Sequence, residues 1–422
     1  MRDLLTEREL LGLGLDIPGM LSRGTLERED ELPAHWNRVR DTLSVRPDEE
    51  AGLSATDGTS NVGSEFLDES VVSSMTDRYG FLSGPDNQVH STKEAPDEEV
   101  EVRLVKTQIR REAKWLEMMN DWESHMLKDY KKVRERCRKG IPSSVRSAAW
   151  LKLSGAHFYL NQADKKHQFK RLYNQKTNSQ NGQNWIDDIE KDLHRNFPTH
   201  ELFGGTYEKI GQAGLFQVLK AYCVLHPAEG YCQAMAPIAA LLLMNMPAEQ
   251  AFWCMVMICD KYIPGYYSPG LEAIQLDGDI LHGLLRRVSP AIYKHLKKQE
   301  IEPVLYMTEW FLCVYSRTLP WPTVMRVWDM FLCEGVKVLF RVGLVLIRAA
   351  LPKSVRKNCP SMYETLDALK NLPPSITQEE VLVEEILRLN LKEDIMEREH
   401  RKQVKRRKAA KLAAATAKSN GS

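Results

Sequence analysis

The sequence predicts an all-α fold, and three features of the chain lead to that expectation. Residues 140–350 alternate apolar stretches of helical period with short turns that contain proline and glycine. Long alternating runs of β-branched residues, which would indicate strands, do not occur in the sequence. The chain has 422 residues and a hydrophobic fraction of 43%, which suffices for a large core. We therefore expect many helices packed against one another in pairs.

Composition divides the chain into five parts, whose boundaries follow changes in charge and apolar pattern. The first part is poor in apolar patterns, and residues 47–100 carry thirteen acidic side chains against two basic ones. Such a composition buries too little apolar surface to fold, so we expect disorder there. The five parts are an acidic N-terminal region (1–99), a lead-in helix (100–139), the main helical domain (140–351), a helical C-terminal extension (352–400) and a basic, alanine-rich tail (401–422).

The lead-in segment is expected to form a helix docked on the main domain. Its large apolar residues recur at helical spacing, which predicts a single buried face. These residues are Trp115, Met118, Met119 and Trp122.

Residues 234–259 are apolar over a length that would suit a membrane span. Polar residues and a proline interrupt the stretch at its middle, where a bilayer penalises polar groups most. We therefore expect two buried helices joined at residues 245–247. The interrupting residues are Asn245, Pro247, Glu249 and Gln250.

Arg195 is the first candidate functional residue, because the segment before it has the pattern of an amphipathic helix. Apolar residues that include Ile189 fall within one arc about 100° wide, and Arg195 lies nearly opposite that arc. Asp192 is three residues earlier, so it neighbours Arg195 on the helix surface and could restrain it. Phe197 precedes Pro198 and should end the helix, which predicts Arg195 at an exposed helix C-terminus. The alternative is a solvated arginine in a local ion pair with Asp192.

Gln233 is the second candidate, because it stands where a turn meets an apolar helix. Residues 226–230 contain several turn formers, and Pro237 suits the first turn of the helix that follows. If the turn is extended, Tyr231 and Gln233 share a face and Cys232 points the other way. The alternative makes Tyr231 a core aromatic residue and Gln233 a helix cap.

An arginine and a glutamine are the two groups that GTP hydrolysis needs most. Arginine neutralises charge on the transferring phosphoryl group, and a glutamine amide orients the attacking water. The sequence has no glycine-rich phosphate loop, nucleophile elbow or helical zinc motif beside them. We therefore do not expect the chain itself to bind GTP.

Four short motifs occur in a characteristic order along the chain, and together they resemble those of TBC-domain Rab GTPase-activating proteins. Each motif alone has little specificity, whereas four of them in order at this spacing are specific. The motifs are GIPSSVRSAAW at 140–150, with Arg146 and Trp150; the Ile189, Asp192 and Arg195 pattern; GYCQ at 230–233; and RVWD at 326–329, with Arg326, Trp328 and Asp329.

Further segments narrow the resemblance to the subfamily that contains carabin and the ezrin-associated TBC proteins. The resemblance covers one upstream hexapeptide and then about residues 111–351, which is rather more than half of the chain. The segments are TDRYGF at 76–81, LLMNMPAEQAFW at 242–253, PGYY at 264–267, YMTEWF at 306–311 and EGVK at 334–337.

The resemblance implies a function and assigns roles to the motif residues. It implies an all-α, multi-helix TBC domain that accelerates GTP hydrolysis by a Rab-family GTPase in its GTP form, and so regulates membrane trafficking. Arg195 would be the arginine finger, and Gln233 the glutamine finger that replaces the GTPase's own glutamine. The chain would be an activator without a cofactor, since the Rab holds GTP and Mg²⁺. Asp192 and Tyr231 would support the fingers, and the remaining motif residues would be structural: Arg146, Trp150, Ile189, Arg326, Trp328 and Asp329.

Two segments depart from the subfamily pattern. Relatives with PDZ-binding tails end in a hydrophobic residue, whereas this chain ends in SNGS at 419–422, which puts a PDZ partner in doubt. Residues 161–184 are polar and rich in lysine, glutamine and asparagine, so we expect a variable surface loop there.

Several classes of protein are not expected. The net charge of +1 argues against a general nucleic-acid binder, and the first residues lack the apolar region of a secretory signal. The eight cysteines have no C-x-x-C pairing and read as reduced thiols of a cytoplasmic protein. No cluster of histidine, cysteine and carboxylate residues has the spacing of a metal site.

The C-terminal part has two further features. Residues 377–380 resemble a capping box that opens a helix. Residues 401–411 carry seven lysines and arginines and no acid, which suits an anionic membrane surface of the plasma membrane or of vesicles, or an import receptor. A solvated charged helix end is the alternative. Two other functions stay open. One is a scaffold that binds a GTPase without catalysis, and the other is a membrane adaptor acting through this basic tail.

Overall fold

The computed structural model describes residues 76–82, 98–177 and 180–419. These residues are helical apart from turns and two isolated β-bridges, which confirms the all-α expectation. Residues 1–75 and 83–97 are not among them, so the disorder expected in the acidic N-terminal region stays a prediction. The elements are α5 (Glu98–Asn120), α6 (Trp122–Lys128), α7 (Tyr130–Arg138), α8 (Ser143–Ser154), α9 (Ala156–Asn161), η3 (Ala163–Lys165), α10 (Gln168–Asn174), α11 (Gln180–Leu193), α12 (Glu201–Gly204), α13 (Glu208–Leu225), α14 (Met235–Leu243), α15 (Ala248–Met257), η4 (Ile258–Tyr262), α16 (Glu272–Val288), α17 (Pro290–Lys298), α18 (Val304–Leu312), α19 (Trp321–Glu334), α20 (Lys337–Ala350), α21 (Lys353–Lys357), α22 (Met362–Lys370), α23 (Pro374–Thr377), α24 (Glu379–Arg388) and α25 (Glu393–Ser419).

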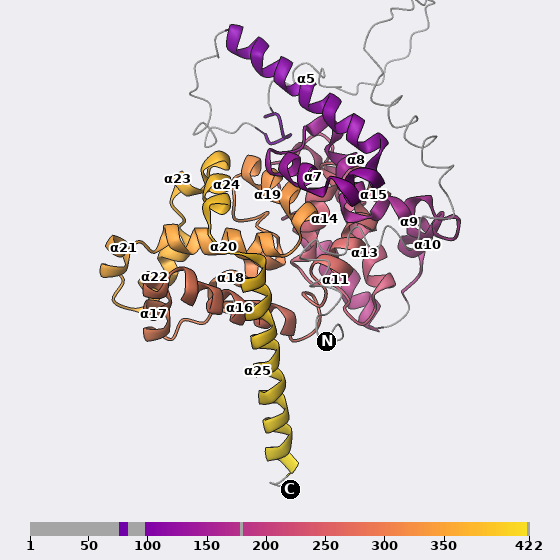
Figure 1. Cartoon of the computed structure of the whole chain (residues 1–422). Coiled ribbons are helices and arrows are strands. Elements are labelled where there is room, and N and C mark those ends of the chain that lie inside the picture. Colours follow the sequence, from indigo (N-terminus) through magenta and orange to yellow (C-terminus); the bar gives the residue numbers. More distant parts are fainter. Residues whose placement is uncertain (1–75, 83–97, 178–179, 420–422) are drawn as a thin grey trace, which may run out of the picture.

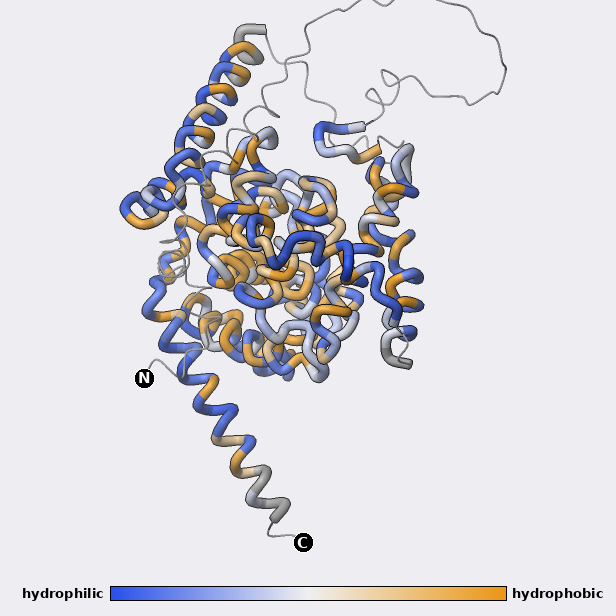
Figure 2. The backbone as a smooth tube through the Cα atoms, turned by 90° about the vertical axis from the view of Figure 1, so that its right-hand side faces the viewer, coloured by the Kyte–Doolittle hydropathy of each residue, from blue (hydrophilic) through white to orange (hydrophobic). Residues whose placement is uncertain are grey.

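The helices form two groups around a shared apolar interior. Figure 1 shows α8–α15 on one side and α16–α24 on the other, with α5 across one end and α25 projecting from the opposite end. In the first group α13 packs against α10, α11, α12, α14 and α15. In the second group α19 packs against α20 and α24 and also contacts α8 of the first group and the preceding helix α7. Hydrophobic segments gather in the centre of the molecule, whereas α25 is predominantly hydrophilic (Figure 2).

The apolar stretch 234–259 forms two buried helices, as its interrupted pattern predicts. Helix α14 ends before Asn245, and Pro247 is the N-cap of α15. Every residue of α14 except its last is buried, and α15 is buried from Ala251 onward. Among the described residues no helix combines the length and apolar character that crossing a membrane requires.

The lead-in segment is three helices rather than one. Asp121 and Asp129 leave helical geometry, with φ values of −127° and −123°, and so separate α5, α6 and α7. The predicted apolar face is nevertheless buried, because Trp115, Met119 and Trp122 are each at most 2% exposed. Residues 161–184 also differ from the expected surface loop. They contain α10, which packs on α13 and buries Phe169.

A buried carboxylate, Asp329, joins the motif at 140–150 to the motif at 326–329. One of its oxygens accepts hydrogen bonds from Trp150 Nε1 at 2.8 Å and Arg146 Nε at 3.4 Å, and the other accepts from Ile141 N at 2.7 Å. Burial raises the pKa of Asp329 above its ordinary value, while the Arg146 charge and the hydrogen bonds oppose that rise. The Trp328 ring lies 5.6 Å from that of Trp150. These contacts attach α8 to α19.

Arg326 connects the same region to the C-terminal extension. Its Nη1 donates to the Arg138 carbonyl oxygen at 2.9 Å, and its guanidinium forms an ion pair with Glu379 of α24. Arg138 in turn forms two 2.6 Å hydrogen bonds to Glu334 at the end of α19. The extension is therefore part of the packed domain.

The capping box expected at 377–380 is wrong. Thr377, the expected N-cap residue, belongs to α23, and its hydroxyl donates to the Pro374 carbonyl at 3.0 Å. Gln378 is the N-cap of α24 instead, and its side chain makes no capping hydrogen bond. A capping box does occur two helices earlier, where Ser361 and Glu364 cap α22.

The basic segment 401–411 lies within α25, which crosses the expected boundary between extension and tail. This helix packs along α16. Arg407 Nε lies 2.7 Å from Asp279 Oδ2, and Lys411 Nζ lies 2.7 Å from Glu272 Oε2. The acidic side chains of α16 thus neutralise part of the positive charge, so this segment is only partly a solvated helix end.

We predict that Asp329→Ala lowers the free energy of unfolding by about 3–5 kcal/mol, because it leaves the Arg146 charge and two buried donors without their acceptor. Urea denaturation measures the change. Asp188→Ala, which removes an exposed carboxylate from α11, is the control and should change stability by less than about 0.5 kcal/mol. Equal effects of the two substitutions would contradict the proposed role of the buried carboxylate.

Candidate functional site

Arg195 lies in the turn that follows α11. The helix ends at Leu193, earlier than the sequence-based expectation, and Asn196 Nδ2 donates to the Asp192 carbonyl oxygen at 2.6 Å. This bond satisfies one of the carbonyl groups that a helix end leaves without a partner. The Arg195 side chain is 47% exposed and pairs with the Asp192 carboxylate. The predicted exposure and the predicted ion pair are therefore both present.

Asp192 is buried, and its carboxylate joins two separate segments. Its side chain is only 4% exposed. Oδ1 faces the Arg195 guanidinium, and Oδ2 accepts a 2.6 Å hydrogen bond from the Tyr231 hydroxyl. Burial raises the pKa of Tyr231, and the hydrogen bond to Asp192 raises it further, so the tyrosine stays a donor. A buried carboxylate requires such partners, because an unpaired one is strongly destabilising.

Gly230 places the loop before Gln233 directly against α11. Its φ is +65°, which glycine adopts without steric cost. A Cβ at this position would lie 2.5 Å from Nε1 of Trp185, so a larger residue could not approach the helix as closely. The preceding turn is closed by the Gly230 N–H, which donates to the His226 carbonyl at 3.0 Å. Helix α11 thus supports both the Arg195 turn and the loop at 230–233.

Gln233 is exposed in a turn just before α14. The Met235 N–H donates to the Cys232 carbonyl at 2.8 Å, so the segment is a turn and not an extended stretch. Gln233 consequently lines a pocket together with Cys232, and Tyr231 is directed to Asp192 instead. No side chain caps α14, so the alternative of a capping Gln233 does not hold. Among the described residues the side-chain amide of Gln233 makes no hydrogen bond.

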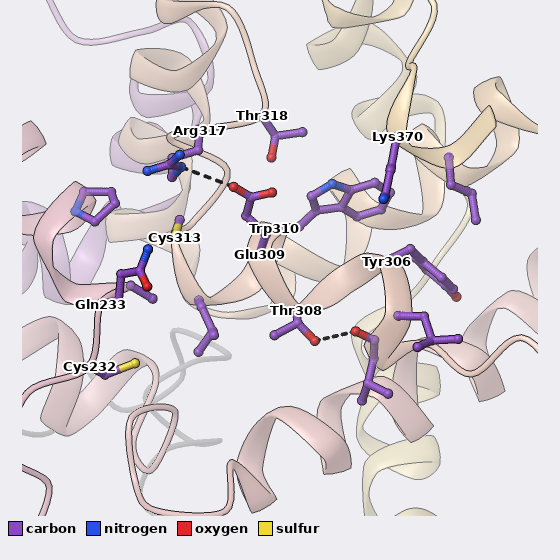
Figure 3. Close-up of a pocket in the computed structure, with 16 residues that line it drawn as sticks. Cys232, Gln233, Tyr306, Thr308, Glu309, Trp310, Cys313, Arg317, Thr318 and Lys370 are labelled. Carbon is purple, nitrogen blue, oxygen red and sulfur yellow. Dashed lines mark hydrogen bonds and ion pairs between the residues drawn. The ribbon is translucent and has the colours of Figure 1, made fainter. Parts of the chain in front are cut away.

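The pocket beside Gln233 has a volume of 780 Å³ and lies between the start of α14, helix α18 and the end of α22. Figure 3 shows Gln233 and Cys232 on one side of the pocket, with the Arg317 and Glu309 side chains above them in the view. Arg317 Nε donates to Glu309 Oε1 at 3.2 Å, and the two side chains are 45% and 61% exposed. Sequence reasoning did not identify these two as site residues, although Glu309 lies in the YMTEWF segment.

Arg195 offers an exposed guanidinium and Gln233 an exposed side-chain amide, and their supporting loops meet at the Asp192 carboxylate. The Cys232 thiol is not set up as a nucleophile, because burial raises its pKa above the ordinary value. All eight cysteines are free thiols. The part of the chain that the structure describes contains no group of three histidine, cysteine or carboxylate side chains able to hold a metal ion. The expectation that the chain needs no cofactor stays a prediction.

Comparison with known proteins gives consistent matches. The Rab-GTPase-TBC domain family model matches residues 143–353. TBC1 domain family member 10A of Mus musculus is 47% identical over 91% of this chain and 73% of its own length. TBC1 domain family member 10B of Homo sapiens is 50% identical over 84% of this chain, but only 42% of its own length is matched. Carabin of Mus musculus is 45% identical over 78% of this chain and 71% of its own length.

Solved structures share the fold. The Chlamydomonas flagellar RabGAP TBC domain is 27% identical, with a TM-score of 0.54 over 74% of this chain and 99% of that one. The Ypt/Rab-GAP domain of Gyp1p is 20% identical, with a TM-score of 0.51 over 66% of this chain and 96% of that one.

We predict that Tyr231→Phe lowers the free energy of unfolding by about 1.5–3 kcal/mol, because it removes a hydrogen bond to a charged, buried acceptor. Chemical denaturation tests this. Tyr207→Phe is the matched control, because that tyrosine is 41% exposed and its loss should cost less than about 0.5 kcal/mol. A Tyr231→Phe protein as stable as the control would show that Asp192 does not depend on the hydroxyl.

Proposed function

The chain belongs to the Rab-GTPase-TBC domain family, and we propose that it activates GTP hydrolysis by a Rab-family GTPase, with Arg195 and Gln233 as the groups it supplies in trans. The observation that carries the assignment of residues is the Asp192 carboxylate, which binds Arg195 on one side and Tyr231 on the other. It holds an exposed cation near the segment that presents an exposed amide. This is the pair of groups that phosphoryl transfer to water requires.

Arg195 would stabilise the negative charge that spreads over the transferring phosphoryl group. A free arginine side chain loses about 2 kcal/mol of conformational entropy when it is held in one position. The ion pair with Asp192 restricts the side chain before the partner arrives, which lowers that cost. The Arg195 side chain is 47% exposed, so phosphate oxygens of a partner can reach the guanidinium and compete for it.

Gln233 would orient the attacking water in place of the GTPase's own glutamine. Its amide is exposed and uncommitted among the described residues, as this role requires. GTP and Mg²⁺ would be held by the Rab. A scaffold that binds the GTPase without accelerating hydrolysis is the competing function, and an assay of turnover distinguishes the two.

Contact of residues 401–411 with an anionic membrane, from a cytoplasmic location, remains a second proposal. Intramolecular ion pairs reduce the charge that is free for lipid, which weakens attraction to the surface. The basic side chains already paired with acids are Arg401, Lys402, Arg407 and Lys411.

We predict that Arg195→Ala reduces stimulated GTP hydrolysis by a factor on the order of 10³–10⁵, the range typical of arginine fingers. Arg195→Lys should also fail, because a point charge cannot replace the planar guanidinium. Single-turnover hydrolysis across a panel of Rabs is the measurement. Lys191→Ala removes a neighbouring exposed positive charge and should retain activity. A lysine variant with most of the wild-type rate would refute the assignment.

We predict that Gln233→Ala lowers the stimulated rate while the affinity for the GTP-bound Rab is unchanged, because the amide acts on water and not on docking. The chain should still stimulate a Rab whose own catalytic glutamine has been replaced. Gln175→Ala, another exposed glutamine, serves as the control in the same assay. Loss of stimulation with the glutamine-substituted Rab would mean that the activator does not bring its own amide.

A further inference from the structure

Residues 76–82, here called the strap, form a compact turn far upstream of the main domain in sequence. The Asp77 carboxylate accepts hydrogen bonds from the Tyr79 N–H at 2.8 Å and the Phe81 N–H at 3.0 Å. The Gly80 N–H donates to the Asp77 carbonyl at 2.9 Å, and Thr76 pairs with Leu82 in an isolated β-bridge. This local network gives the strap a defined shape of its own.

The strap is docked on the turn that carries Arg195, here called the finger turn and comprising residues 194–200. The Leu82 N–H donates to the Thr199 carbonyl at 2.7 Å, and the Glu201 N–H donates to the Gly80 carbonyl at 2.9 Å. The approach is close, because a Cβ on Gly80 would lie 2.8 Å from His200 Nε2. Backbone hydrogen bonds therefore bind the two segments on both sides of His200.

His200 adds a side-chain contact whose direction follows from its two ring nitrogens. Nδ1 accepts a hydrogen bond from the Leu202 N–H at 3.1 Å, so Nε2 carries the proton of the neutral ring and donates it to the Tyr79 carbonyl at 2.9 Å. The neutral form is the expected one, since burial lowers the pKa of His200. One histidine thus caps α12 and holds the strap.

The Phe81 ring completes the contact from the apolar side. Its centroid is 5.0 Å from the rings of His200 and Trp321 and 6.4 Å from that of Phe197. Phe197 has a φ of +49°, a conformation that costs roughly 1–3 kcal/mol for a residue other than glycine and persists only when surrounding contacts enforce it. Phe81 and Trp321 supply such contacts two residues after Arg195.

From these contacts we infer that the strap is a positioning element for Arg195. The finger turn is anchored at its start by the Asp192 carboxylate and at its end by the strap. Without the strap the finger turn loses two hydrogen bonds and the Phe81 packing, the adjoining Glu201 of α12 loses a third hydrogen bond, and Phe197 is freer to leave its left-handed conformation. Arg195 would then be displaced, and misplacement of a reacting group by about 1 Å can cost on the order of 10²-fold in rate. This inference rests on the proposed function of Arg195.

The test compares the full-length chain with its Phe81→Ala variant. We expect the stimulated rate at saturating activator to fall by a factor on the order of 10–10², with the affinity for the GTP-bound Rab changed less than about twofold. Hydrogen exchange at the Glu201 amide should accelerate, because its acceptor is the Gly80 carbonyl. A variant without residues 76–82 should behave in the same way, and a synthetic peptide of the strap sequence should restore part of its rate, whereas the peptide with the Phe81→Ala change should not.

A destabilised control separates positioning from general loss of stability. Phe169 lies in α10, outside the strap and the finger turn. Phe169→Leu perturbs the packing of that helix, so it should lower the melting temperature while the stimulated rate per folded molecule stays at the wild-type value. Unchanged stimulation in Phe81→Ala, or an equal loss in Phe169→Leu, overturns the inference while the wild-type chain remains active. A wild-type chain that stimulates no Rab overturns the proposed function and this inference with it, which is a distinct result.

Discussion

The candidate site depends on one buried carboxylate. Asp192 is removed from water, so its charge must be balanced by donors that the fold supplies. One donor, Arg195, comes from the turn directly after the same helix, and the other, Tyr231, comes from the loop that leads to α14. Because both oxygens of one group are used, the two loops cannot move apart without taking one of its two partners from the buried carboxylate. The exposed Arg195 guanidinium and the loop that carries the exposed amide of Gln233 are therefore both positioned relative to Asp192.

A comparison with Asp329 shows why one carboxylate belongs to the scaffold and the other to a site. The donors to Asp329 are buried or nearly so, and each belongs to a helix or turn that packs in the core. Exchange of those partners would require opening the interior. Asp192 instead has one partly buried partner, Tyr231, and one half-exposed partner, Arg195, which a ligand can reach from solvent. Its arginine can therefore be released to a ligand while the tyrosine keeps the carboxylate in place.

Local patterns predicted the local features of this molecule. The apolar arc that contains Ile189, the exposure of Arg195, the junction before α14 and the break at Pro247 all follow from helical periodicity and turn chemistry. Two errors arose where another local hydrogen bond competes with the expected one. Helix α11 ends early because the Asn196 side chain caps it, and Thr377 forms no capping box because its hydroxyl donates to the Pro374 carbonyl within α23. The pairing of α25 with α16, and that of the strap with the finger turn, could not be predicted, since periodicity does not encode which distant segments meet.

The two functional side chains are positioned by different physical means, and the difference follows from their lengths. Arginine has a long, flexible side chain, so its placement requires contacts along its course and at its base: the Asp192 carboxylate and the strap on the finger turn. Glutamine is shorter, and Gln233 is placed chiefly by its backbone, through the left-handed Gly230 against Trp185 and the turn that opens α14. Changes in side-chain contacts should therefore disturb Arg195 selectively, whereas a change in backbone conformation at Gly230 should disturb Gln233. Because α11 carries both Asp192 and Trp185, a shift of that single helix would disturb the two together.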